Sequence, residues 1–188
     1  MFLSYLELLE AHHRKSVRLK NHDYTRGMYF VTICAKNGEH LFGEIVDGEM
    51  KLSEYGKIVE EEWLRTPIIR PEVTLDVHQI MPNHFHLIVR LVPVTVRRGV
   101  WPYAPTGDVP LTARNGVFAS PSVSLGALMR GFKGAVTKRM RIFDGYDGDL
   151  WLRNYHEHII RNDAELRQIR RYILDNPRNW ERDKENIM

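Results

Sequence analysis

The chain has 188 residues, of which 43% are hydrophobic and 27% are charged, and its formal net charge is +3 at pH 7. This length and balance are typical of one folded domain, and they exclude a largely disordered or collagen-like protein. The lone Cys34 excludes an intramolecular disulfide and a cysteine-cluster zinc site. No apolar run approaches the roughly 20 residues of a membrane span, and we expect no secretory signal.

Basic residues gather in two separate segments. Residues 14–26 hold five bases and one acid, and residues 130–171 hold ten bases and six acids, so that each segment carries a net charge of +4. Between them, residues 44–76 hold nine acids and four bases, a net charge of −5. If the fold brings the basic segments together, they form a phosphate-binding face. The plainer alternative is that these charges lie on solvated helix surfaces.

Periodicity and turn signals predict the secondary structure over most of the chain. The expected elements are a strand at 28–35, a hairpin at 41–52, a helix at 53–66, strands at 73–80 and 84–92, a helix at 124–143, a strand at 151–160 and a helix at 163–176. Asp47-Gly48 marks the hairpin turn, and Ser53 and Ser124 are expected N-caps. Pro67 is expected to end the first helix.

Without the hairpin and the last helix, this order is β-α-β-β-α-β. It predicts an α+β, ferredoxin-like fold, an antiparallel sheet with helices on one face, plus an extra N-terminal hairpin and a C-terminal helix. We expect one domain over 1–188, with a basic arm at 1–26. Residues 93–123 are rich in Pro and Gly without periodicity, and are expected to form an inserted, mobile loop.

The spacing of His84 and His86 is that of a possible metal pair. Residues i and i+2 of a strand point to the same face, so the two imidazoles could converge on one ion while Phe85 packs on the other side. We expect the pair to face the surface and to contribute little packing. The pattern is weak by itself, because the chain has nine histidines and a second such pair, His156 and His158.

The predicted last helix adds Tyr172 and Asn176, which are four residues apart and share a helix face. Each also fits a structural role, as core filler and as the residue before a helix-ending proline. A phenol, an amide oxygen and two imidazoles nevertheless suit phosphodiester chemistry, in which a metal withdraws charge from the phosphate and the phenolate attacks.

Three blocks in this order, MPNHFHLIV, WLRNYHEHIIRN and RRYILDNP, resemble those of the REP-associated tyrosine transposases. That family belongs to the single-tyrosine HUH endonucleases and has the ferredoxin-like fold. The resemblance covers about residues 14–180 outside the 93–123 loop. It implies that His84 and His86 bind a divalent metal, Mg²⁺ or Mn²⁺, and that Tyr172 is the nucleophile.

The third metal ligand implied by the resemblance is Asn176, which stands where related transposases of simpler elements carry Gln. Tyr155 is a rival nucleophile beside the second histidine pair, but it has no partner four residues on that could share the metal. Glu157 and His158 are expected to support the site or the DNA.

The implied function is a metal-dependent endonuclease and strand transferase that acts on single-stranded or hairpin DNA of palindromic repeats. Attack by Tyr172 would leave a 5′-phosphotyrosine link and a free 3′-hydroxyl, without a nucleotide cofactor. The protein is expected in the cytoplasm with the nucleoid, away from membranes, as a monomer or a homodimer. The expected DNA contacts are Arg14, Lys15, Arg18, Lys20, Lys133, Lys138 and Arg139.

Two other functions fit the sequence. The first is a catalytically inactive, sequence-specific DNA-binding protein, which predicts binding without cleavage. The second is an unrelated two-histidine phosphoesterase, which predicts turnover without a covalent protein–DNA adduct.

Overall fold

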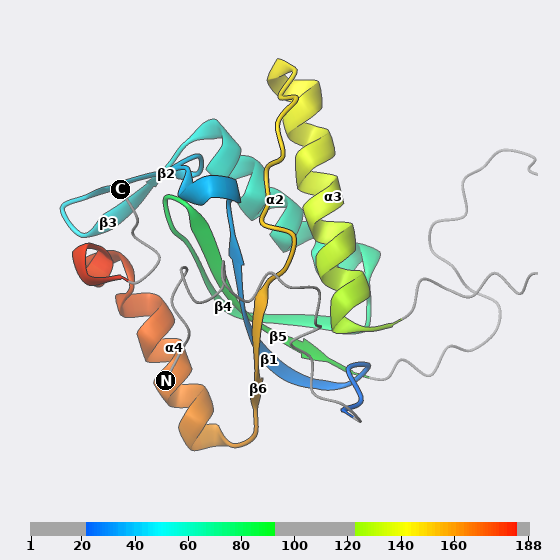
Figure 1. Ribbon diagram of the computed structural model, residues 1–188. Helices are drawn as coiled ribbons and strands as arrows, with labels where there is room; N and C mark the ends of the chain where they lie inside the picture. Colours follow the sequence, from blue (N-terminus) through cyan, green and yellow to red (C-terminus); the bar gives the residue numbers. More distant parts are fainter. Residues whose placement is uncertain (1–21, 93–122, 184–188) are drawn as a thin grey trace, which may run out of the picture.

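A four-stranded antiparallel sheet with the strand order β4-β5-β1-β6 forms the centre of the computed structural model (Figure 1). The structure describes residues 22–92 and 123–183. Its strands are β1 Gly27–Cys34, β2 Gly43–Val46, β3 Glu49–Leu52, β4 Val73–Ile80, β5 His84–Leu91 and β6 His156–Ile160. Its helices are α2 Glu54–Ile69, α3 Leu125–Asp144, α4 Asp163–Asp175 and the 3-10 helices η1 Lys36–Gly38 and η2 Pro177–Arg182.

Helices cover both faces of this sheet (Figure 1). Along β1 the side chains alternate, and Tyr29 and Val31 belong to the core formed with α2 and α3. Phe30 points the other way and packs with Ile169 and Ile173 of α4. The α+β, ferredoxin-like prediction is confirmed, with α2 and α3 on one face, the α2/α3 face, and α4 on the other, the α4 face.

The strand register places polar side chains from three strands side by side on the α4 face. Thr32 of β1 is paired with His86 of β5 and with His156 of β6. Two residues further along β1, Cys34 is paired with His84. Because directly opposed residues of an antiparallel pair point to the same face, these side chains share the space beneath α4.

The predicted hairpin and helix caps form as expected. Strands β2 and β3 make a separate two-stranded sheet, and Asp47 and Gly48 adopt φ values of 53° and 75° in its turn. Positive φ at both central residues is what a tight two-residue hairpin turn requires. The side chains of the expected caps Ser53 and Ser124 each accept a backbone N–H at the start of α2 and α3. Asn162 caps α4 in the same way.

Two element boundaries differ from the prediction. Helix α2 contains Pro67 and continues to Ile69, so the expectation that Pro67 ends it is wrong. A proline in the last turn removes only one intrahelical hydrogen bond. The last strand begins at His156 and not at residue 151, because Trp151 forms only an isolated bridge with Ala35.

The basic residues Arg14, Lys15, Arg18 and Lys20 and the expected loop up to residue 122 lie outside the described residues, so their roles stay predictions. Within residues 22–92 and 123–183, no helix is both long enough and apolar enough to cross a membrane.

Candidate functional site

The predicted metal pair stands at the start of β5. The Nε2 atoms of His84 and His86 lie 3.0 Å apart. Phe85 points to the other face and meets Trp63 edge-on, as strand alternation predicts. The expectation that the pair faces the surface is wrong, because His84 is 0% exposed and His86 is 2% exposed. Burial means that replacing either residue also disturbs packing.

The donor set fits a divalent cation. Two nitrogens that bind one ion at a right angle, with bonds of roughly 2.1 Å, lie about 3 Å apart, which matches the Nε2 separation. A carboxylate oxygen of Asp183 lies 3.9 Å from Nε2 of His84. The ligand atoms of His84, His86 and Asp183 all lie within 4.8 Å of one another. Imidazole nitrogens together with carboxylate oxygens are common ligands of divalent metals.

Both imidazoles are uncharged at neutral pH. Burial, together with a smaller effect of the charge on His40, lowers the pKa of His84 to about 3. Burial also lowers the pKa of His86 far below its usual range, with the same effect from His84 and His156, while Asp183 acts against it. A metal binds a neutral imidazole, so neither ring has to lose a positive charge before a cation binds at neutral pH.

The other ring nitrogen of each histidine has a hydrogen-bond partner. Nδ1 of His84 lies 2.9 Å from Oδ1 of Asn83, whose amide nitrogen donates to the carbonyl of Gly38. Nδ1 of His86 lies 2.8 Å from the hydroxyl of Thr32. Such partners fix the orientation of ligating imidazoles, and here they direct both Nε2 atoms toward the same point.

Helix α4 brings Tyr172 to the histidine pair. Its hydroxyl lies 3.4 Å from Nε2 of His86, although the two residues are 86 positions apart. Its ring packs edge-on against Phe30, with the ring centres 6.0 Å apart. The residue is 39% exposed, so a ligand from solvent can reach Tyr172 although its ring is packed on one side.

One turn later, Asn176 has helical dihedral angles, φ −59° and ψ −43°, so the predicted shared helix face is formed. Asn176 is 3% exposed, and its Oδ1 is buried without a hydrogen-bond partner among the described residues. A buried polar atom without a partner costs about 1–3 kcal/mol. A bound cation would relieve this cost, so Asn176 is a candidate oxygen donor in addition to Asp183.

Asp183 and Trp180 belong to the site although the sequence gives no sign of them. Helix η2 follows α4 directly and lies beside the hairpin strand β3 (Figure 1). The Trp180 ring lies 6.0 Å from that of His84 and 5.5 Å from that of His40. Asp183 ends this helix. No spacing rule connects these residues to the histidines, because the connection depends on where η2 packs.

The rival nucleophile Tyr155 packs against the core of the α2/α3 face, where the ammonium group of Lys133 lies 5.9 Å from its ring. Tyr155 therefore lies across the sheet from Tyr172. Glu157 is paired with Val31 and points to that same face. Both of its carboxylate oxygens are buried without a hydrogen-bond partner among the described residues.

The second histidine pair is divided between two environments. His156 is in register with Thr32, beside the metal pair. His158 Nε2 lies 2.6 Å from a carboxylate oxygen of Glu165, on α4. The pair therefore does not converge on one point as His84 and His86 do, and His158 contacts the helix that carries Tyr172.

The predicted DNA contact Lys133 uses its ammonium group within the molecule. Nζ donates to the carbonyls of Leu152 and Asn154, at 2.8 and 3.0 Å. Burial lowers its pKa to about 8. These contacts fix the segment before β6 onto α3, and they leave little of this charge for a phosphate.

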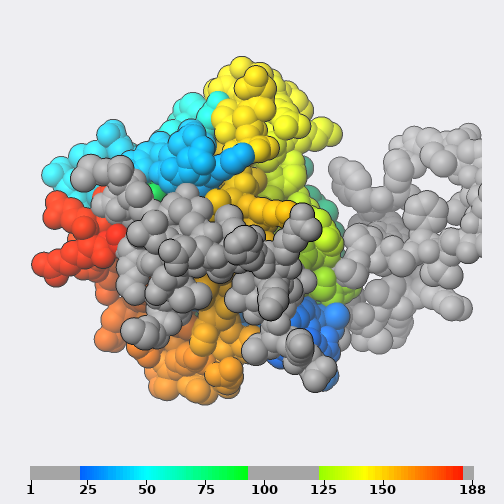
Figure 2. Space-filling model, in the orientation of Figure 1, coloured from blue at the N-terminus to red at the C-terminus, as the bar shows by residue number. Residues whose placement is uncertain are grey.

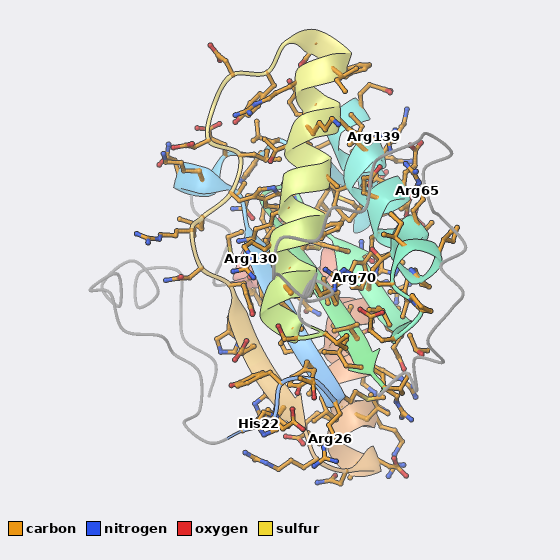
Figure 3. The ribbon with its side chains drawn as sticks, turned by 90° about the vertical axis from the view of Figure 1, so that its right-hand side faces the viewer. His22, Arg26, Arg65, Arg70, Arg130 and Arg139 are labelled. Carbon is orange, nitrogen blue, oxygen red and sulfur yellow. The ribbon has the colours of Figure 1, made fainter. Side chains whose placement is uncertain are left out.

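Arg139, another predicted DNA contact, is paired with Glu61 and Glu62 of α2. Figure 3 shows Arg139 and Arg65 together on the helical layer. Both line a groove of about 580 Å³ between α2 and α3, whose charges are of both signs.

The third predicted DNA contact on α3, Lys138, is exposed. In the space-filling view, α3 and α4 with η2 form opposite sides of the molecule (Figure 2).

Helix α4 is fixed to the edge strand β4 by an ion pair. The register of β4 shifts between Leu75 and His78, a bulge that contains Asp76. Arg170 donates to both carboxylate oxygens of Asp76, at 2.8 and 2.6 Å. The hydrogen bonds from Arg170 are the main reason why the pKa of Asp76 is lowered.

Replacing Arg170 with alanine should lower the free energy of unfolding at pH 7 by about 0.5–1 kcal/mol, a small value because the guanidinium is partly exposed. The lowered pKa of folded Asp76 means that this contribution is present above the unfolded value near 4 and is lost as pH falls through the folded value. Urea unfolding should therefore show a smaller difference at pH 3 than at pH 7. Arg167→Ala, an exposed change on the same helix, is the matched control, and an equal effect of both changes at both pH values would contradict the role of the ion pair.

No protein-family profile matches the chain. An uncharacterized protein of Haemophilus influenzae (strain Rd) is 39% identical over 178 residues, which cover 92% of this chain and 93% of that protein. A solved structure of a REP-associated tyrosine transposase bound to a REP hairpin is similar with a TM-score of 0.56. The similarity covers 89% of this chain and 77% of that one at 19% identity, and it establishes a shared fold.

Proposed function

We propose that this chain, which belongs to the same family as the Haemophilus influenzae protein and has the fold of the REP-associated tyrosine transposase, cleaves and rejoins single-stranded DNA. In this proposal Tyr172 is the nucleophile, and a divalent cation is held by His84 and His86 with an oxygen donor from Asn176 or Asp183.

One observation carries this proposal. The Tyr172 hydroxyl lies 3.4 Å from Nε2 of His86, which in turn lies 3.0 Å from Nε2 of His84. The nucleophile and the nitrogen ligands come from different elements, and the packing of α4 on the sheet brings them together. A phosphate next to the pair would be within reach of the phenol.

When bound, the cation would withdraw charge from the scissile phosphate and so make the phosphorus more electrophilic. The chain supplies the attacking group and its alignment. Phe30 holds the Tyr172 ring from one side, and the Asp76–Arg170 ion pair holds α4 on β4. A nucleophile fixed in this way loses little freedom on reaching the phosphate.

The step exchanges one phosphodiester for another. The Tyr172 oxygen forms a bond to phosphorus, and the bond between phosphorus and the 3′-oxygen breaks. The phenol proton passes to water, and the departing 3′-oxygen takes up a proton. The 5′-phosphotyrosine link keeps the phosphodiester energy, so a second 3′-hydroxyl can reverse the step on another strand without a nucleotide cofactor.

The proposed substrate is a DNA hairpin with a single-stranded flank. The solved transposase of the same fold is bound to a REP hairpin, and we extend that ligand class to this chain. The basic residues clustered in segments 14–26 and 130–171 support a polyanionic partner.

Incubation of the purified protein with a labelled hairpin and Mn²⁺ tests this function. We expect a labelled band that migrates with the protein on a denaturing gel, together with a free 3′-hydroxyl fragment. Binding without cleavage would favour the inactive DNA-binding alternative. Turnover of small phosphodiesters without a protein-linked label would favour the phosphoesterase alternative.

DNA affinity should fall steeply with salt. If Arg14, Lys15, Arg18 and Lys20 each neutralise one phosphate, the dissociation constant should rise about 100-fold between 50 and 200 mM salt. Fluorescence anisotropy with a labelled hairpin would measure this slope. Replacing all four residues with alanine should flatten the dependence, whereas Lys138→Ala should change it by about one phosphate at most. A flat dependence in the wild type would contradict the predicted basic arm.

Asn176→Ala should weaken Mn²⁺ binding by about 10-fold or more, as loss of one ligand or its support does in other metal sites. Cleavage should slow, while the attacked bond stays the same. Isothermal titration calorimetry would measure the affinity. The control is Asn179→Ala, because Asn179 is exposed and its amide donates to the carbonyl of Asp175.

The same titration on Asp183→Asn separates the two oxygen donors. A large loss with Asp183→Asn and none with Asn176→Ala would assign the oxygen ligand to Asp183 and would contradict the predicted role of Asn176.

A further inference from the structure

We propose that Thr32 is a positioning residue whose hydroxyl changes from hydrogen-bond donor to acceptor when His86 changes tautomer to bind a divalent cation, whereas Asn83 locks His84 in one tautomer. This inference rests on the metal-dependent function proposed above. It assigns roles to two residues that are not among the proposed metal ligands or DNA contacts.

Asn83 leaves His84 no choice of tautomer. The side-chain amide nitrogen of Asn83 donates to the carbonyl of Gly38, at 3.3 Å. Its oxygen is therefore the atom that faces Nδ1 of His84, at 2.9 Å. An amide oxygen only accepts, so Nδ1 carries the ring hydrogen. Nε2 of His84 then has a free lone pair, with or without a metal.

Without a cation, the contact between the two rings determines the tautomer of His86. Their Nε2 atoms lie 3.0 Å apart, a hydrogen-bond distance that needs one hydrogen. His84 has none at this position, so His86 supplies it from Nε2. Nδ1 of His86 is then bare, and it accepts from the hydroxyl of Thr32, at 2.8 Å.

Cation binding reverses these roles. Nε2 of His86 can bind a metal only with its lone pair free, so the ring hydrogen must move to Nδ1 by exchange with water. The ring holds one such hydrogen before and after, and its charge does not change. Thr32 now accepts from Nδ1 through its oxygen, because a hydroxyl can rotate and serve as either donor or acceptor.

The position makes this property of Thr32 important. Thr32 is 6% exposed, so bulk water cannot replace its hydroxyl. It is in register with His86 on the neighbouring strand, which fixes the distance through the backbone. Valine has the same shape but can neither donate nor accept, so it would support neither tautomer. Serine keeps both abilities.

Nitrogen-15 NMR of the full-length protein, with labelled histidine and resonances assigned by His84→Gln and His86→Gln, reads the tautomers directly. In the metal-free protein we expect hydrogen on Nδ1 of His84 and on Nε2 of His86. Added Mg²⁺ should move the His86 hydrogen to Nδ1 and leave that of His84 in place. The same tautomer of His86 with and without Mg²⁺ would overturn the switch.

Calorimetric titration with Mn²⁺ tests the role of the hydroxyl. Thr32→Val should weaken Mn²⁺ binding by about 10- to 100-fold, the usual effect of losing a partner of a ligating imidazole. Thr32→Ser should restore it to within a few-fold of the wild type. Thr137→Val is the matched control, because it removes a hydroxyl that donates to the carbonyl of Lys133 within α3. Wild-type affinity in Thr32→Val would overturn the proposal.

Failure of this inference can be told apart from failure of the proposed function. Cation binding with the expected tautomer change, but without any covalent DNA adduct, would contradict the proposed function and leave the switch standing. A DNA adduct with unchanged tautomers would contradict the switch and leave the proposed function standing.

Discussion

Tyr172→Phe should abolish the covalent protein–DNA adduct and leave DNA and Mn²⁺ binding within about twofold of the wild type. The change removes the attacking oxygen and keeps the ring that packs on Phe30. The contact of the hydroxyl with Nε2 of His86 is long, at 3.4 Å, so the free energy of unfolding should change by less than about 1 kcal/mol. Denaturing gels with a labelled hairpin measure the adduct, and anisotropy measures binding.

Tyr155→Phe is the control for this experiment. Tyr155 packs on the α2/α3 face, across the sheet from the histidine pair, so its variant should retain the adduct. An adduct of wild-type yield in Tyr172→Phe, or loss of the adduct in Tyr155→Phe alone, would show that Tyr172 is not the nucleophile.

Replacing His84 and His86 with alanine should abolish Mn²⁺-dependent stabilisation and cleavage. A ligand that binds only the folded protein raises the free energy of unfolding by about 2.7 kcal/mol at 100 times its dissociation constant. The wild type should therefore show a higher melting temperature in Mn²⁺, and the double variant should show no shift. This readout does not depend on the starting stability of the variant.

That independence matters because both histidines are buried. Truncating them should itself cost about 2–5 kcal/mol, the range usual for large-to-small changes in a packed interior. His158→Ala serves as the control, since His158 contacts Glu165 and is not part of the pair. An unchanged Mn²⁺ shift in the double variant would refute the assignment of the metal site.

Local sequence signals predicted most of the fold because most turns and helix ends depend on a few neighbouring residues. The left-handed turn at Asp47-Gly48 and the N-cap of Ser53 are two examples. Pro67 misled the prediction because the cost of a proline depends on its position, and the last turn of α2 tolerates it. The late start of β6 had no local marker, since Trp151 belongs to an apolar stretch in either case.

The site, like the fold, could be predicted from the sequence only in part. The HxH spacing on a strand and the four-residue spacing of Tyr172 and Asn176 on a helix are periodic, so the sequence revealed both pairs. That these pairs meet depends on α4 packing on the face opposite α2 and α3, which no local signal gives. Thr32 could have been found only from the register of β1 and β5. Burial of the histidines depends likewise on tertiary packing.

Mass spectrometry of the trapped adduct tests the central claim most directly. Wild-type protein would be reacted with a short hairpin substrate and Mn²⁺, denatured and digested with trypsin, and the DNA trimmed to the linked nucleotide. We predict that the nucleotide is attached through a 5′-phosphate to Tyr172, in the peptide of residues 172–178. Attachment to Tyr155, in the peptide of residues 154–161, would contradict the account, because that side chain lies across the sheet from His84 and His86.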